Sequence, residues 1–162
     1  MRTEMTNIVD ERIGVHMTTL QMSLSATIEK AIKEASGNLD QITEILMNRP
    51  DGFQVISGDD NLTLHMILLG GEGVISVSGQ GVPEVFCKMV DSALEGDFYT
   101  AREAHLALFD LTNLLFAEGN PAGIKALLDL RGICGDAVRL PLIPASADLR
   151  NQLATELTQL QL

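Results

Sequence analysis

Residues 53–77 read FQVISGDDNLTLHMILLGGEGVISV, and the hydrophobic period of this segment changes twice. Phe53–Ser57 is a short β-prone run after an Asp-Gly turn, which predicts a strand. Asn61–Leu69 has helical spacing and ends at a Gly-Gly pair, and Val74–Val77 is a second predicted strand. Strand–helix repeats with short connections predict parallel strands joined by right-handed crossovers.

The strand–helix pattern extends from about residue 27 to residue 95 and stops after Gly96. We expect a strand over Thr27–Lys33 and helices over Gly37–Asn48 and Pro83–Leu94. After Gly96 only helices are expected. The first is expected over Asp97–Phe116. The second has its N-cap at Asn120, Pro121 at its first helical position and Gly132 at its C-terminus. The last is capped by Ser146.

This pattern predicts an α/β chain of three parts. Residues 1–26 form a degraded N-terminal segment, and the helical pattern of Met17–Ile28 is only fair. Residues 27–95 carry the βα units, and residues 96–162 form an all-helical extension.

Composition excludes several classes of function. The 162 residues contain 22 Asp and Glu against 11 Lys and Arg, a net charge of −11, which argues against a nucleic-acid partner. No apolar run approaches the ~20 residues that a membrane helix requires. The N-terminus lacks the apolar core of a signal peptide, so a cytoplasmic protein is expected. Cys87 and Cys134 lack metal-type spacing, and we expect both to be small buried side chains.

Lys33 is the residue with the clearest chemical potential. It lies at the predicted carboxyl end of a strand, where parallel α/β proteins bind ligands, and burial there would favour its neutral amine. A neutral amine can attack a ketone and form a Schiff base, which acts as an electron sink. A surface or ion-paired lysine is the competing interpretation. For Asp59 and Asp60, which follow the next strand, helix capping is the favoured interpretation.

Six motifs in order give the chain a specific resemblance. They are Ile32-Lys33-Glu34-Ala35-Ser36-Gly37, Val55-Ile56-Ser57-Gly58-Asp59-Asp60, the segment from Gly70 to Val77, Leu94-Glu95-Gly96-Asp97-Phe98, Asn120-Pro121-Ala122-Gly123-Ile124-Lys125 and Leu140-Pro141-Leu142-Ile143-Pro144. This set resembles the C-terminal half of the dihydrodipicolinate synthase (4-hydroxy-tetrahydrodipicolinate synthase) family. The resemblance implies the last three βα units of a (β/α)8 TIM barrel followed by a C-terminal helical extension.

The resemblance also implies a reaction and its residues. Lys33 matches the lysine that forms an imine with pyruvate, and the resulting enamine attacks L-aspartate 4-semialdehyde in lysine biosynthesis through diaminopimelate. Ile75 matches a residue whose backbone borders pyruvate, and Arg12 matches the arginine that binds the carboxylate of the second substrate. No metal and no organic cofactor is implied, because the lysine itself provides the electron sink.

The chain departs from the family in lacking a counterpart of the first four strands. The resemblance therefore implies a lyase that needs association to be active, either as a homo-oligomer or with a complementing fragment, because three strands cannot close a barrel. One alternative is a non-catalytic paralogue that pairs with a full-length homologue. Another is a lyase of the same superfamily that acts on a sialic-acid-type or 2-keto-3-deoxy sugar acid.

Overall fold

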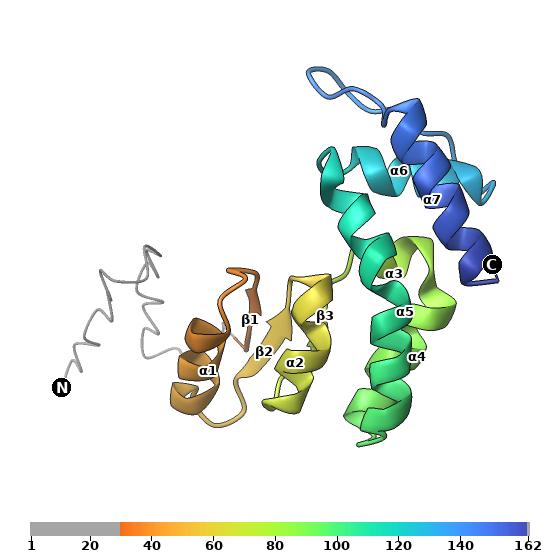
Figure 1. Cartoon of the computed structure of the whole chain (residues 1–162). Helices are drawn as coiled ribbons and strands as arrows, with labels where there is room; N and C mark the ends of the chain where they lie inside the picture. Colours follow the sequence, from red (N-terminus) through yellow and green to blue (C-terminus); the bar gives the residue numbers. More distant parts are fainter. Residues whose placement is uncertain (1–29, 162) are drawn as a thin grey trace.

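Three short parallel strands and their crossovers form the first part of the described chain. The computed structural model describes residues 30–161, in which β1 is Ala31–Glu34, β2 is Gln54–Ser57 and β3 is Gly73–Val74. The sheet order is β1-β2-β3 (Figure 1). Helix α1, Leu39–Asn48, connects β1 to β2, and the 3₁₀ helix η1, Asp60–Leu62, precedes helix α2, Thr63–Leu68. The predicted parallel pairing is confirmed.

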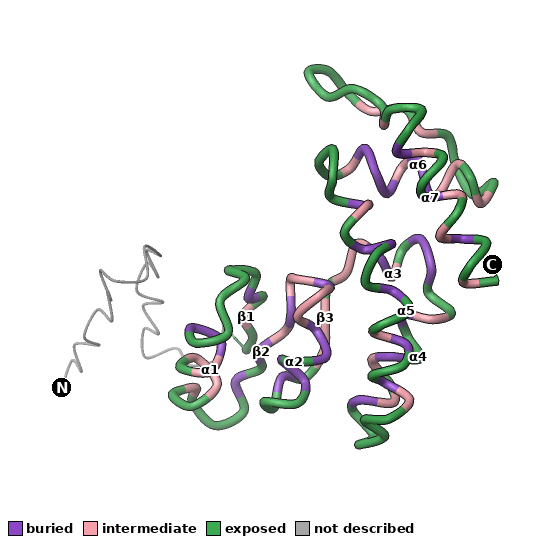
Figure 2. The backbone as a smooth tube through the Cα atoms, in the orientation of Figure 1, coloured by how far each residue is buried: buried purple, intermediate pink, exposed green. Residues whose placement is uncertain are grey.

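Helices and the loops that connect them make up the rest of the described chain. The helices are α3 (Ser78–Gly81), α4 (Pro83–Leu94), α5 (Phe98–Ala117), α6 (Ala122–Leu130) and α7 (Ala147–Gln159). The largest core cluster is built between α4, α5, α6 and α7, and includes the fully buried Leu111, Leu127 and Leu153. Figure 2 shows how the buried positions repeat along the helices and leave the outer surfaces exposed.

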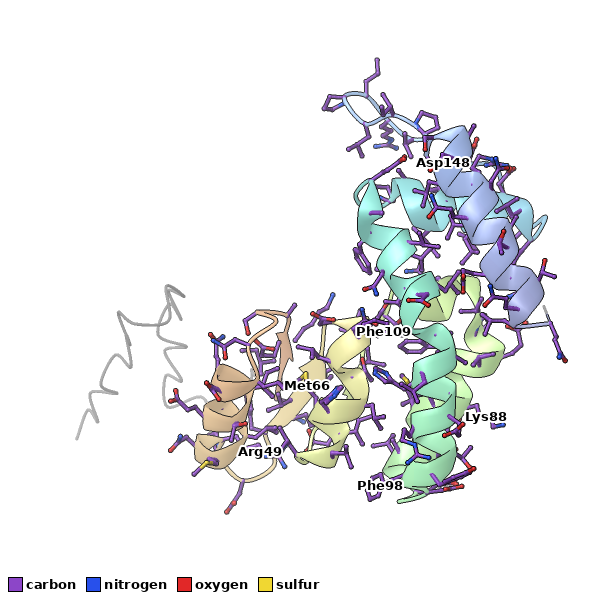
Figure 3. All side chains as sticks on the ribbon, in the orientation of Figure 1. Arg49, Met66, Lys88, Phe98, Phe109 and Asp148 are labelled. Carbon is purple, nitrogen blue, oxygen red and sulfur yellow. The ribbon has the colours of Figure 1, made fainter. Side chains whose placement is uncertain are left out.

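Among the described residues, helices cover one face of the sheet only. Ile42 of α1, Val55 of β2 and Met66 of α2 belong to one buried cluster, so both crossover helices pack on the face that Val55 presents. Met66 is labelled between these elements in Figure 3. The opposite face carries Lys33 and Gln54, which are both exposed. Within residues 30–161, β1 pairs only with β2, so its outer edge also lacks a neighbouring strand.

Local sequence signals set most helix boundaries as expected. Helix α4 has the predicted bounds and begins with Pro83, a residue suited to the first turn because it has no N–H to leave unpaired. The Ser146 side chain accepts a hydrogen bond from the backbone N–H of Leu149 at 3.1 Å and caps α7, as predicted. The Asn38 side chain accepts from Asp40 N and Gln41 N, so α1 starts at Leu39.

The strand predicted over Val74–Val77 is too long. Strand β3 ends at Val74, and only the N–H of Ile75 continues the ladder by donating to the Ser57 carbonyl at 2.9 Å. The backbone then turns, because the N–H groups of Val77 and Ser78 donate to the Asp60 carboxylate instead of a strand. The short helix α3 follows at once, over Ser78–Gly81.

Three other expectations need correction or fall outside the described residues. Cys87 and Cys134 are exposed, which contradicts their predicted burial, because Cys87 is rotated away from the buried face of α4 and Cys134 lies in the exposed segment after α6. Pro121 is the N-cap of α6 and not its first helical residue. The strand predicted over Thr27–Lys33 is observed over Ala31–Glu34; residues 1–29, including the N-terminal segment 1–26, lie outside the described residues.

The junction between the sheet and the helical region is a small apolar cluster with a histidine pair beside it. Leu64 and Ile67 of α2 pack with Ala93 of α4 and Ala101 of α5. The rings of His65 and His105 meet edge-on with their centroids 5.5 Å apart, and Phe109 lies next to His105. Phe109 is labelled on α5 in Figure 3.

Acid should weaken this junction through His105. Burial lowers the pKa of His105 below its ordinary value of 6.5, and the charge of His65 lowers it further. Because the unfolded chain then binds the proton more tightly, the contribution of His105 to stability is complete above pH 6.5 and is lost as the pH falls through the lowered folded-state pKa. The unfolding free energy of the wild type should therefore fall between about pH 7 and pH 5, and it should fall less in His105→Gln. Urea titration at both pH values measures the difference. An identical pH dependence in the wild type and the variant would contradict this assignment.

Candidate active site

Lys33 and Ile75 lie on the same face of the sheet, close to its carboxyl edge. Lys33 aligns with Ile56, and Ile56 aligns with Gly73. Because successive residues of a strand alternate between faces, the side chains of Lys33 and Ile75 point away from the covering helices, on the face where Gly58 lies between them. Ile75 is 56% exposed. The two residues predicted for pyruvate chemistry therefore share one uncovered face.

The absence of a side chain at Gly58 makes room for Lys33. A Cβ atom at position 58 would lie 2.6 Å from Lys33 Cε, 2.9 Å from Lys33 Cγ and 2.8 Å from Ala35 Cβ. The lysine stem therefore runs across the backbone of the neighbouring strand. The Lys33 residue as a whole is exposed, so residues 30–161 do not provide the burial expected for it from the sequence.

Glu34 fixes the turn that follows Lys33. It is buried on the opposite face, and its Oε1 accepts from the Ser36 N–H at 2.9 Å and from Gln41 Nε2 at 3.3 Å. Ser36 Oγ in turn accepts from the Asn38 N–H at 3.1 Å. These bonds connect the end of β1 to the start of α1 and thereby restrain the backbone next to Lys33.

Asp59 and Asp60 have different roles. Asp59 Oδ1 accepts from the Asn61 N–H at 3.0 Å as the N-cap of η1, which confirms the capping interpretation for this residue. Asp60 is buried and its Oδ2 accepts from the backbone N–H groups of Val77 at 3.0 Å and Ser78 at 2.7 Å. Asp60 therefore joins the loop after β2 to the segment after β3, a long-range contact that the capping interpretation missed.

Two further residues of this edge were not predicted as part of the site. Ser78 Oγ lies 3.1 Å from Thr112 Oγ1, and both residues are buried. Thr112 comes from α5, so the long helix contributes a polar contact to the carboxyl edge of the sheet. A threonine among apolar residues on the buried stripe of α5 is the sequence signal that could have indicated this contact.

Arg12 lies outside the described residues. Lys30 lines a pocket of about 610 Å³ at the opposite, amino end of the strands, together with Arg49 and Glu72, which form an ion pair at 2.9 Å. Among residues 30–161, no cluster of three His, Cys, Asp or Glu side chains is arranged to hold a metal ion. No helix in the described part of the chain is long and apolar enough to cross a membrane.

Gly58→Ala tests the packing of Lys33 on β2. The added methyl group must displace the lysine stem or Ala35, so we expect the unfolding free energy to fall by roughly 1–3 kcal/mol. Gly135→Ala is the matched control, because its Cβ would meet nothing within 4 Å, and we expect a change within about 0.5 kcal/mol. Urea titration measures both values. Equal stability of the two variants would show that Lys33 does not occupy this position.

Comparison with known proteins places these features in a family. The model of the dihydrodipicolinate synthetase family matches residues 5–160. The chain is 43% identical over 157 residues to the 4-hydroxy-tetrahydrodipicolinate synthase of Phocaeicola vulgatus, covering 95% of this chain and 53% of that protein. The chain thus spans about half the length of the curated relatives it matches.

Solved structures agree with the sequence match. Dihydrodipicolinate synthase from Aquifex aeolicus is similar with a TM-score of 0.77 and 42% identity, covering 82% of this chain and 45% of that one. The chloride-inhibited Acinetobacter baumannii enzyme, solved in complex with pyruvate, is similar with a TM-score of 0.73 and 30% identity, covering 78% and 44%. The chain belongs to the dihydrodipicolinate synthetase family.

Proposed function

We propose that this chain supplies the imine-forming part of a 4-hydroxy-tetrahydrodipicolinate synthase. The observation that carries the proposal is the position of Lys33 in a member of this family: on a parallel strand, at its carboxyl edge, packed across Gly58 on the same face as Ile75. Residues 27–95 would be the last three βα units of a (β/α)8 barrel, and residues 96–162 its helical extension. The carboxyl edge of barrel strands is where ligands bind in such folds.

Lys33 would act as the nucleophile. Its Nζ attacks the C2 carbonyl of pyruvate, and loss of water gives an imine. Loss of a proton from the pyruvate methyl group then gives an enamine, whose carbon attacks the aldehyde of L-aspartate 4-semialdehyde. The amino group that comes from the semialdehyde then attacks the imine carbon, which closes the six-membered ring, breaks the bond to Nζ and regenerates the Lys33 amine. The imine accepts the electron pair of the broken C–H bond and the enamine returns that pair to form the C–C bond, so the chemistry needs no further electron sink.

Ile75 and Arg12 would position the substrates. The Ile75 backbone leaves the β ladder at the edge next to Lys33, where it can border bound pyruvate. The Acinetobacter baumannii relative is described as a complex with pyruvate, which supports this substrate class. The Arg12 guanidinium would bind the carboxylate of the semialdehyde through two parallel hydrogen bonds, a geometry that suits this pair of groups.

Association would provide the cover that the Lys33 face requires. Nucleophilic attack needs the neutral amine, and removal of a lysine from water favours that form. In residues 30–161 the lysine is exposed, and β1 has an unpaired edge that can accept a further strand. We propose that a second copy of the chain or a complementing fragment covers this face and edge and so activates Lys33.

Borohydride trapping with pyruvate tests the proposal. We expect a reduced pyruvyl adduct on Lys33, located by peptide mass spectrometry, in the chain alone or after addition of an N-terminal half from the Phocaeicola vulgatus relative. Lys33→Arg should abolish the adduct because the guanidinium does not form an imine under these conditions. Lys30→Arg is the matched control: it lies at the amino end of the strands and should leave trapping unchanged.

Two results would contradict the proposal. An adduct that persists in Lys33→Arg would assign the chemistry to another amine. Absence of an adduct under every condition, including with a full-length homologue present, would favour the alternative of a non-catalytic paralogue that pairs with such a homologue.

A further inference from the structure

A buried polar network connects the segment that carries Ile75 to the helical region. Asp60, Ser78 and Thr112 are each at most 5% exposed and belong to η1, α3 and α5. Asp60 Oδ2 accepts two backbone N–H groups from the segment after β3, and Ser78 Oγ shares a hydrogen bond with Thr112 Oγ1. The network therefore joins three elements that are far apart in the sequence.

Ile75–Ser78 is held at both ends by different kinds of contact. At its start, the Ile75 N–H donates to the Ser57 carbonyl at 2.9 Å as an extension of the sheet. At its end, the N–H groups of Val77 and Ser78 point to Asp60. Only the second contact turns the chain out of the strand, so the path of the backbone after Ile75 depends on a side chain from the preceding loop.

The Asp60 carboxylate is a strong anchor for this path. Hydrogen bonds from backbone N–H groups to a carboxylate are shorter and roughly twice as strong as neutral ones. The second oxygen, Oδ1, is buried without a partner among the described residues, so the whole attachment of this side chain depends on Oδ2. Burial of a carboxylate costs desolvation free energy, and only hydrogen bonds from well-placed amides offset this cost. The position of the Asp60 side chain therefore depends on the positions of the amides that it binds.

We propose that Asp60 is a positioning residue that sets the conformation of Ile75–Ser78, with Thr112 of α5 as its support from the helical region. The consequence for pyruvate rests on the proposed function above, because Ile75 borders pyruvate only if that function holds. In this arrangement the helical extension acts on the site through Thr112 and Ser78, without contacting the substrate.

Amide hydrogen exchange on the full chain tests the positioning role directly. Asp60→Asn should accelerate exchange of the Ile75 amide, which Asp60 does not bond, by about tenfold or more, because the segment loses its charged anchor. Asp59→Asn is the matched control, since Asp59 caps only its own loop, and it should leave the Ile75 amide unchanged. Thr112→Val should also accelerate exchange of the Ile75 amide. Thr112→Ser keeps the hydroxyl group, so exchange in this variant should be as slow as in the wild type.

A second measurement connects the network to the ligand. In the borohydride assay, Asp60→Asn and Thr112→Val should raise the half-saturating pyruvate concentration about tenfold and keep the maximal trapping rate within about twofold. Unfolding titrations serve to check that the variants are folded. If Asp60→Asn does not fold, the comparison of Thr112→Val with Thr112→Ser decides whether the network positions Ile75–Ser78.

The outcomes separate this inference from the proposed function. Unchanged exchange of Ile75 in Asp60→Asn, or equal effects of Thr112→Val and Thr112→Ser, would overturn the positioning role. Faster exchange without any change in the pyruvate dependence would show that the segment does not border pyruvate, which also overturns the role at this site. If the wild type forms no adduct, the proposed function fails, and the Ile75 amide still decides whether Asp60 positions the segment.

Discussion

The uncovered face of the three-stranded sheet is the constraint on which the remaining features depend. Crossover helices α1 and α2 bury the other face around Ile42, Val55 and Met66. A parallel sheet is normally covered on both faces, either by helices or by closure into a barrel. Within residues 30–161, Lys33 and Ile75 lie on the face that has neither. The same geometry that brings these two residues together therefore leaves the lysine exposed to water.

Besides forming its own core, the helical region stabilises the three-stranded sheet. Helices α4 to α7 build the largest core cluster, and α2 contacts this region through the apolar junction at Ala93 and Ala101. The Ser78–Thr112 contact adds a polar connection at the carboxyl edge. In this way a region rich in local contacts stabilises a sheet that is too small to be stable alone.

Periodicity and capping signals predict the helices well, and long-range contacts account for the errors. Helical spacing places Phe86, Met89 and Ala93 on one face of α4, and all three are buried, whereas Cys87 follows Phe86 by one residue and is rotated away from that face. The β-prone segment Val74–Val77 stops pairing early because Asp60, from another loop, binds its amides. Lys33 could be identified from the sequence by resemblance, but its packing on Gly58 depends on strand register, which no local signal specifies.

The most direct test of this account is the reactivity of Lys33 toward an amine-acylating reagent, measured by peptide mass spectrometry with the exposed Lys88 of α4 as the internal reference. The account predicts similar acylation of both lysines in the chain alone and selective protection of Lys33 when an N-terminal half from a full-length relative is bound. Protection of Lys33 in the chain alone, or its full reactivity in the complex, would contradict it.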